Sequence, residues 1–415
     1  MRRQKNQKEQ EADAAERERM YACWLSSVPG IGSRTAQKLF ALCPKAQEIY
    51  DMGERLWEKA LTDRQMEQIR SFVKSTAPED LWGTLRERGI RFVMLSDTDY
   101  PQRLRDIPDP PPGLFVKGRL PDEDCLSVAV IGARDCSEYG KFVADGIGRE
   151  LGRRGVQVIS GMARGIDGIS QEAALRAGGS SFGVLGCGVD ICYPASNQRL
   201  YDLLCEQGGI LSVHPPGTEA RPQHFPPRNR IVSGLADALI VVEAKGKSGT
   251  LITVDMALEQ GREVYAVPGR VTDRLSDGCN RLIEQGAGVF LTPEDFLREL
   301  EEGRCSLAAG QAGMSRMVKE QVLSSAGGRE PGSGVQSRED VSGRWGRHID
   351  CAHLTLEQKE LCKVLDWQPL SLEQIQARLP RKYTVPELMA QLMSLCLENI
   401  AVQESPGQFC LRAQH

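Results

Sequence analysis

The feature that most constrains the fold of this chain is an alternation of short β-rich runs and helical runs between about residues 80 and 300. The helical runs place apolar side chains three and four positions apart, as Tyr139, Phe142 and Val143 do. Val- and Ile-rich strands that alternate with helices form a parallel sheet with helices on both faces. The sequence therefore predicts an α/β core over residues 78–302. Its strands are expected at residues 128–131, 156–159, 181–185, 210–213, 238–242, 264–267 and 289–291.

The segments next to this core differ from it in composition. Residues 1–17 form a charged tail, and residues 18–77 have the apolar periodicity of helices. Residues 28–32, VPGIG, are typical of a loop between two helices, and Ser33 is placed to cap the second one. We expect a helical domain of the helix-hairpin-helix or SAM-like type at residues 18–77. Residues 303–350 are rich in Gly and Ser and predict a flexible linker.

The C-terminal segment, residues 351–415, has signals for helices and for a hairpin. Strand-like runs at residues 400–402 and 409–411 flank Ser-Pro-Gly at residues 405–407, which favours a hairpin. Helices closed by a hairpin predict a winged-helix domain. Two capping boxes, each of which opens an amphipathic run, lie at Ser371 with Gln374 and at Thr384 with Glu387.

Charge and cysteine content exclude several classes of protein. The chain has 52 basic and 56 acidic side chains and a net charge of -4, so any attraction for polyanions must come from a local patch. Its 13 cysteines form no C-x-x-C pair and its 5 histidines have no ligand spacing, so we expect reduced thiols and no metal site. No signal peptide and no long apolar run are present. We expect a cytoplasmic protein without membrane insertion.

Glycine and arginine gather behind the predicted strands. The carboxyl ends of parallel strands meet at one edge of the sheet, where helix N-termini also converge. Glycine lets the backbone approach an anion closely, and the fork of arginine matches phosphate oxygens. In any single loop, tight turns and ion pairs explain these residues more simply, but five loops together favour a phosphate-binding pocket. The candidate residues are Gly132, Arg134, Ser160, Gly161, Arg164, Gly165, Phe225, Arg228, Asn229, Arg230, Lys245, Ser248, Gly249 and Thr250.

Two common nucleotide-binding motifs are absent from these loops. Residues 247–250, KSGT, follow an apolar strand and open a helix, but the G-x-x-x-x-G-K-[ST] spacing of a phosphate loop for ATP is missing. The G-x-G-x-x-G of dinucleotide-binding folds is also missing after the first predicted strand. We therefore expect no cofactor.

Six motifs of the core occur together in a recognisable order, and they resemble the DNA processing protein DprA (Smf) family over about residues 80–297. The resemblance implies a Rossmann-like core that binds single-stranded DNA, loads the RecA recombinase onto it, acts in natural transformation and forms a homodimer. One departure is Val213, where the family usually has glutamate, and it puts any pocket role of that glutamate in doubt. The motifs lie at residues 130–134, 160–167, 185–190, 225–230, 248–253 and 266–269.

An enzyme acting on nucleotides or nucleoside monophosphates is the alternative. Phosphoribohydrolases with a similar fold carry acids behind a G-G-x-G-T loop, and cleavage of an N-glycosidic bond needs a carboxylate near the ribose. Here residues 251–253 are Leu-Ile-Thr, so the acid is missing. Glu243, Asp255 and Asp167 are more easily interpreted as partners of basic residues, although Asp167 could equally cap its helix. No catalytic residue is predicted.

Single-stranded DNA fits the predicted pocket physically. Several cations would neutralise backbone phosphates, with a salt slope of about -0.7 per phosphate. Residues 126–300 hold 18 Lys and Arg against 21 Asp and Glu, a net charge of -3, so binding should be moderate and strongly salt-dependent. Phe225 is the first candidate for stacking on a base, and Tyr193 is the second.

The roles of the two end segments stay open at this point. The loop at residues 28–32 is equally well interpreted as a phosphate-gripping hairpin and as a plain turn. Residues 385–396, the expected recognition helix of the winged helix, contain no Lys or Arg and carry Glu387. Insertion into a DNA groove is therefore disfavoured, and a protein contact or a regulatory role is favoured.

Overall fold

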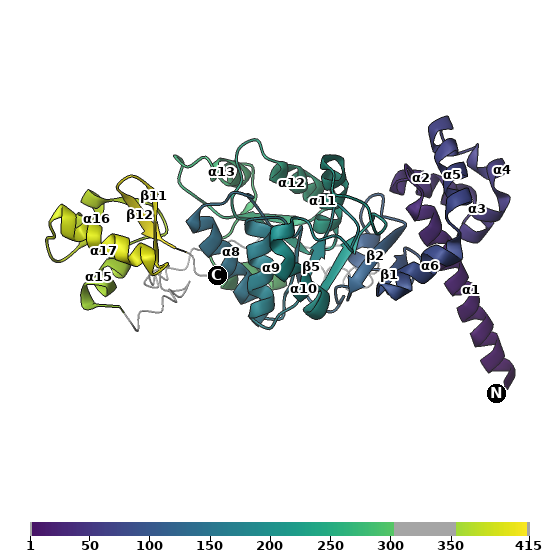
Figure 1. Cartoon of the computed structure of the whole chain (residues 1–415), viewed down its shortest axis with the longest axis horizontal. Helices are drawn as coiled ribbons and strands as arrows, with labels where there is room; N and C mark the ends of the chain where they lie inside the picture. The colour runs from purple at the N-terminus through teal and green to yellow at the C-terminus, as the bar shows by residue number, and fades with distance from the viewer. Residues whose placement is uncertain (1, 303–353, 413–415) are drawn as a thin grey trace, which may run out of the picture. The chain divides into compact units, whose positions relative to one another are not determined.

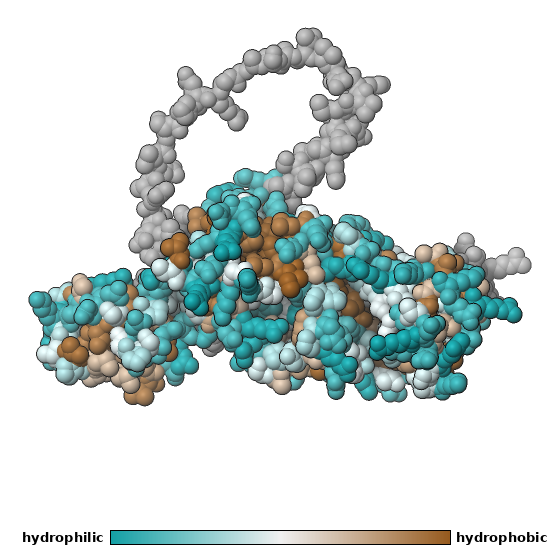
Figure 2. Space-filling model, turned by 90° about the horizontal axis from the view of Figure 1, so that it is seen from above, coloured by the Kyte–Doolittle hydropathy of each residue, from teal (hydrophilic) through white to brown (hydrophobic). Residues whose placement is uncertain are grey.

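The computed structural model describes residues 2–302 and 354–412 (Figure 1). The chain divides into two compact units, Met1–Gly288 and Val289–His415, and each is described by itself. The predicted linker at residues 303–350 lies outside the described residues. Hydrophilic residues cover much of the face that Figure 2 shows, and no described helix is long and apolar enough to span a bilayer.

The first unit is built on a nine-stranded sheet in the order β1-β2-β6-β5-β4-β3-β7-β8-β9. From β6 to β8, neighbouring strands are parallel. All the strands expected from the sequence are present to within a few residues. The strands are β1 (Ile90–Met94), β2 (Gly113–Gly118), β3 (Ser127–Ile131), β4 (Gln157–Ser160), β5 (Ser181–Val184), β6 (Gly209–Ser212), β7 (Ala238–Val241), β8 (Glu263–Ala266) and β9 (Gly288–Val289).

The expectation of a parallel sheet is only partly right, because β1 and β2 add an antiparallel edge. β1 pairs antiparallel with β2, and β2 pairs antiparallel with β6. Phe92 and Phe115 face each other across the first pair, with ring centroids 5.0 Å apart. The connection between β1 and β2 contains helix α7 (Gln102–Arg105) and several prolines instead of a tight turn, so no local hairpin signal marks this pair.

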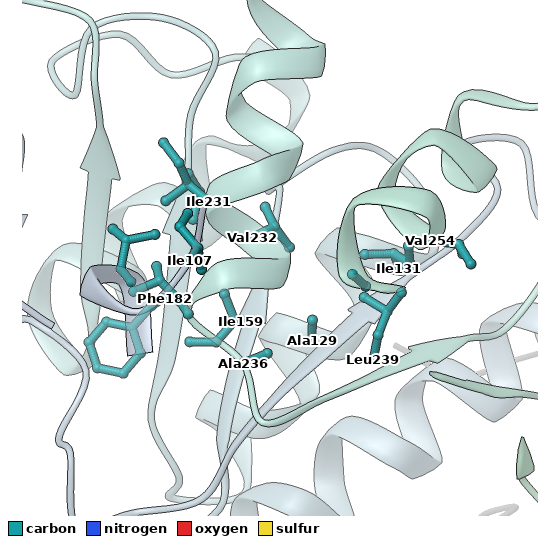
Figure 3. Packing of buried hydrophobic residues seen from close by; sticks show 14 of the residues in the cluster. Ile107, Ala129, Ile131, Ile159, Phe182, Ile231, Val232, Ala236, Leu239 and Val254 are labelled. Carbon is teal, nitrogen blue, oxygen red and sulfur yellow. The ribbon is translucent and has the colours of Figure 1, made fainter. Parts of the chain in front are cut away.

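Helices cover both faces of the sheet because successive strand residues point to opposite sides. Ile231, Val232 and Val254 pack against Ile159 and Leu239 on one face (Figure 3). A second cluster holds apolar residues of β1, β2 and β6 together with apolar residues of α9 and α10. Burial of each such side chain contributes about 1.5–3 kcal/mol. The helices are α8 (Glu138–Arg153), α9 (Ile166–Arg176), α10 (Gln198–Gln207), α11 (Phe225–Gly234), α12 (Gly249–Glu259) and α13 (Asp277–Glu284).

Six helices precede the sheet, and the charged tail is the beginning of the first. Their core includes Trp24, Leu39 and Ile69. Ser33 is not a helix cap as expected: it is the first residue of α2, and Gly32 takes the N-cap position without a side-chain bond. The helices are α1 (Arg2–Ser27), α2 (Ser33–Leu42), α3 (Ala46–Met52), α4 (Glu54–Trp57), α5 (Asp63–Ser75) and α6 (Pro78–Glu87).

Residues 354–412 form three helices and a three-stranded antiparallel sheet in the order β10-β12-β11. Leu361, Ile375 and Leu392 are fully buried in its core. Both capping boxes predicted from the sequence are present, and the expected hairpin is formed by β11 and β12. The elements are α15 (Leu356–Val364), β10 (Leu370–Ser371), α16 (Leu372–Arg378), α17 (Val385–Leu397), β11 (Ala401–Ser405) and β12 (Gln408–Leu411).

Candidate functional site

The strand order locates the point where a ligand cavity is expected. β3 is the first strand of the parallel part, with β4 on one side and β7 on the other, so the direction of winding reverses between β3 and β7. Ligands of open α/β sheets bind in the crevice outside the carboxyl ends of the strands at such a point. A cavity of about 480 Å³, here called the main cavity, lies there, lined by the end of β3, by the loop after β7 and by residues of α11 and α12.

Most of the predicted site residues line this cavity although they come from separate loops. A second cavity of about 190 Å³ shares Arg134, Gly161, Phe225 and Arg228 with it, and Arg164 lines only this smaller cavity. The structure therefore brings the loops together at one edge, as expected. The predicted residues that line the main cavity are Gly132, Arg134, Gly161, Phe225, Arg228, Asn229, Lys245, Ser248, Gly249 and Thr250.

Ser160, Gly165 and Arg230 line neither cavity. The Ser160 hydroxyl is buried and donates to Val130 O at 2.6 Å, which ties β4 to β3. Gly165 has φ of +81° and packs against the carbonyls of Ala133 and Arg134, a conformation and a closeness that only glycine tolerates. These two residues support the loops behind the cavity.

Arg230 points away from the cavities, because it lies on a different side of α11 from Asn229. Its Nη1 donates to Pro108 O at 2.8 Å. The nearest charges that act on it are those of Asp109 and Arg34, which belong to the segment before β2 and to α2. Arg230 follows Arg228 by two positions in the sequence. Successive residues of an α-helix are about 100° apart around its axis, so these two side chains leave α11 in nearly opposite directions and cannot face the same cavity.

Arg228 is the most buried of the predicted cations, with a side chain only 5% exposed. Its Nη1 donates to Val184 O at 3.1 Å. Burial lowers its pKa, and the neighbouring Asp167 carboxylate acts in the opposite direction. An arginine nevertheless stays protonated in a protein. A buried cation therefore lies under the floor that the two cavities share.

Asp167 is the counter-charge of Arg228 and is also buried, at 8% exposure. Burial raises its pKa, and Arg228 opposes this effect. Asp167 Oδ2 accepts from Gly161 N at 3.2 Å, so the carboxylate does not cap its own helix, whose N-cap is Gly165. A Cβ at Gly161 would collide with both the Arg228 guanidinium and the Asp167 carboxylate, which explains the glycine there.

Aromatic and cationic side chains meet where the two cavities join. The guanidinium carbon of Arg134 lies 5.3 Å from the centre of the Phe225 ring, and that of Arg228 lies 5.7 Å from it. Both distances are in the range of a cation–π interaction. Tyr193 lies 5.8 Å from Phe225, centroid to centroid, and is 44% exposed. Phe225 is half-buried, so Tyr193 offers the more open ring.

The start of α12 opens on the main cavity. Ser248 is its N-cap residue, and its buried hydroxyl has no hydrogen-bond partner among the described residues. Thr250 Oγ1 donates to Gly132 O at 3.3 Å, which joins the loops after β7 and β3. The first turn of a helix leaves backbone N–H groups without intrahelical partners and favours an anion.

The acidic residues near the cavity are engaged with other groups. Glu243 is buried and accepts from Ser137 N at 3.0 Å, at the start of α8. Asp135 forms an exposed ion pair with Arg164 at 2.6 Å. Asp167 and Asp135 are the carboxylates that line the main cavity. Both carboxylates have partners, Asp167 in Gly161 N and Asp135 in Arg164, so neither is an isolated carboxylate that faces a ligand.

Several residues of the lining were missed by the sequence analysis. Pro222, Pro226, Ile252 and Leu275 supply apolar surface to the main cavity. Leu275 belongs to the loop after β8, in which no site residue was predicted. Val213, at the position where the related family has glutamate, is partly buried and packs against the core.

Two stacked histidines lie beside the smaller cavity and predict a response to acid. The ring centroids of His214 and His224 are 4.2 Å apart. Burial, with a smaller contribution from His224, lowers the pKa of His214 from 6.5 to about 4. The unfolded chain therefore takes up this proton at a higher pH than the folded chain does.

We expect the free energy of unfolding to fall as pH decreases from about 6.5 to about 4, and to fall less in His214→Phe. Phenylalanine preserves a ring in the stack and cannot take up a proton. Urea unfolding at a series of pH values measures the difference, and measurements near pH 8 show whether the variant keeps its stability. Parallel pH profiles of the two proteins would contradict the assignment.

The fold and the cavity define the class: an α/β protein with helices on both faces of a mixed sheet and a cavity lined by basic loops at the topological switch point. Residues 91–301 match the family described as DNA recombination-mediator protein A, and the chain belongs to this family. The resemblance seen in the sequence motifs is thereby confirmed.

Individual relatives agree with this assignment. The chain is 44% identical over 221 residues to DNA processing protein DprA of Bacillus subtilis, an alignment that covers 52% of this chain and 73% of the relative. It is 40% identical over 250 residues to protein Smf of Escherichia coli, which covers 60% and 66%, respectively. The crystal structure of DprA from Streptococcus pneumoniae superposes with a TM-score of 0.58 at 33% identity and covers 67% of this chain and 96% of that one.

Proposed function

We propose that this chain is a cytoplasmic, non-enzymatic recombination mediator that binds single-stranded DNA and loads the RecA recombinase onto it during DNA uptake and recombination. The observation that carries the proposal is the convergence of Arg134, Arg228, Lys245 and the start of α12 on one cavity of a core whose net charge is negative. Cations concentrated in such a protein are typical of a specific site for a phosphate-bearing ligand.

The geometry suits a sugar-phosphate backbone with unstacked bases. Arg134 is exposed and is free of ion pairs within the described residues, so its guanidinium is available for a phosphate. Lys245 and the first turn of α12 supply further donors to the lining of the main cavity. Tyr193, and behind it Phe225, offer ring faces on which a base can stack.

The same geometry supports binding without catalysis. Hydrolysis of a nucleotide would require a carboxylate or another base positioned at the ligand. Asp167 is turned to Gly161 N and Arg228, and Asp135 is paired with Arg164. Incubation with nucleoside monophosphates is expected to release no free base, and a robust release would favour the alternative of a phosphoribohydrolase-type enzyme.

Apolar surface on the core supports the proposal of protein partners, namely RecA and a second copy of the chain. Ile252 and Leu258 on α12 are 44% and 58% exposed, and Val271 is 88% exposed. Figure 2 shows hydrophobic residues gathered on the face of the core seen from above. Large exposed apolar patches are rare on monomeric proteins and often mark protein–protein contacts. RecA filament assembly on single-stranded DNA, with and without the protein, measures the loading step.

For the end modules we propose a helical domain at residues 18–77 and a winged-helix domain at residues 351–415. Helix α17 carries no Lys or Arg and exposes Val385, Met393 and Leu397. A largely apolar recognition helix whose one charged side chain is the acidic Glu387 favours a protein partner over a DNA groove.

The proposed function predicts a preference for single strands and a strong dependence on salt. A dT oligonucleotide should bind more tightly than a duplex of the same length, and log Kd should vary with log salt by about 0.7 for each phosphate engaged. Titrations at several salt concentrations, followed by fluorescence anisotropy, measure both quantities. Equal affinity for the duplex, or a slope near zero, would exclude the proposed mode of binding.

A further inference from the structure

The loops after β7 and β8 together carry four basic residues, and one of them, Lys245, is already placed in the lining of the main cavity. Lys245 and Lys247 belong to the first loop, and Arg270 and Arg274 to the second. We call these four residues the basic rim. Lys245 and Leu275, the residue that follows Arg274, both line the main cavity, so both loops reach it.

Backbone hydrogen bonds join the two loops. Ala244 N donates to Leu275 O at 2.8 Å, which brings the residues before Lys245 and after Arg274 into contact. Within the second loop, Asp273 N donates to Arg270 O at 3.0 Å and closes a turn between the two arginines. The two loops that carry the four cations therefore lie against each other, although 29 positions of the sequence separate the first cation from the last.

The second loop has a defined shape because its two ends meet. Gly269 lies against the side chain of Ser276, which leaves no room for a Cβ. The side-chain amide of Asn280 binds both the N–H and the carbonyl of Gly269, each at 3.1 Å. A loop anchored in this way presents its arginines on a rigid base, which lowers the entropy cost of binding.

The rim side chains are exposed, and none forms an ion pair or a hydrogen bond within the described ranges 2–302 and 354–412. Besides the buried Glu243, the two loops contain one carboxylate, that of Asp273, and it accepts from Leu275 N at 3.0 Å. Other arginines of the core behave differently: Arg154, Arg164 and Arg176 are all paired with acids. Asp277, the first residue of α13, lies near Gly246 but forms no ion pair with the rim within the described ranges. Positive charge therefore exceeds negative charge at the rim of a core that is acidic as a whole.

We propose that the basic rim binds backbone phosphates of nucleotides that flank the unit held in the main cavity, and so defines one path by which a single strand leaves the cavity. This inference rests on the proposed binding of single-stranded DNA. A row of unpaired cations that begins inside the cavity and continues outside it fits a polymeric polyanion, because a lone nucleotide would fill the cavity without reaching Arg270 or Arg274. Contact with the rim therefore depends on oligonucleotide length.

The test compares Arg270→Ala/Arg274→Ala with the wild-type chain on thymidine monophosphate and on a dT oligonucleotide of about 20 nucleotides. For the longer probe we expect about a fivefold to tenfold loss of affinity near 0.1 M salt and a salt slope reduced by about 1.4, the value for two phosphates. For the mononucleotide the affinity should change by less than about twofold, since it occupies only the main cavity. The matched control is Arg153→Ala/Arg154→Ala, which removes two exposed arginines at the carboxyl end of α8.

The outcomes separate the rim from the cavity. Equal losses with both probes, a loss also in the control variant, or no loss with the longer probe would each overturn the rim as an exit path. A wild-type chain that binds neither probe would refute the proposed function and the rim with it. Binding that Arg134→Ala weakens while the rim variant does not would leave the cavity assigned and reject the rim alone.

Discussion

Arg134→Ala is expected to weaken the binding of a dT oligonucleotide by about tenfold or more. The side chain is exposed at the junction of both cavities, contacts Phe225 and has no carboxylate partner among the described residues. A hydrogen bond to a charged group contributes about 1.5–3 kcal/mol, and about 1.4 kcal/mol corresponds to a factor of ten. Fluorescence anisotropy at fixed salt measures the change.

Arg134→Lys serves as the graded control for this prediction. Lysine keeps the charge but loses the planar fork, so its affinity should lie between those of the wild-type chain and the alanine variant. Thermal melting shows that both variants are folded. A loss of less than about threefold for Arg134→Ala would remove Arg134 from the site.

Arg228→Met should destabilise the fold by about 3–5 kcal/mol, because it leaves the buried carboxylate of Asp167 without its counter-charge. Methionine fills a similar volume, so the cost comes mainly from the charge and not from a cavity. The free energy of unfolding in urea, extrapolated to water, is the quantity to measure.

The double variant Arg228→Met/Asp167→Asn separates the charge effect from a packing effect. Asparagine still accepts a hydrogen bond from Gly161 N but carries no charge, so the double variant should recover much of the lost stability. If Arg228→Met costs less than about 1 kcal/mol, or if the double variant is less stable than the single one, the buried pair does not have the role assigned to it.

Much of the core could be predicted because its signals are local. Val- and Ile-rich runs mark β3 to β9, and the rule that parallel strands end at one edge places their loops together. This rule predicts the edge of the sheet at which the loops lie, but it does not predict the direction in which each side chain points. Ser160, Gly165 and Arg230 illustrate this, since all three lie near the predicted edge of the sheet yet line neither cavity.

Other features left no local trace in the sequence. β1 and β2 are joined by a long connection, and β2 pairs with β6, about a hundred residues later. The position of the basic rim depends on the hydrogen bond between Ala244 N and Leu275 O. The spacing of residues within either loop does not predict this contact. Such features arise from pairing between distant segments, and a motif search within short windows cannot detect them.

The amino-acid sequence alone determined the succession of β3 to β9 along the chain, the capping boxes of the second unit, and the loops that carry glycine and cations, because propensity, periodicity and turn chemistry act between near neighbours. The tertiary structure decided which cations face the cavity, which are buried against a carboxylate and which continue onto the surface. Those choices depend on burial and on electrostatic fields from segments far away in the chain, and they exist only once the sheet has brought the segments together.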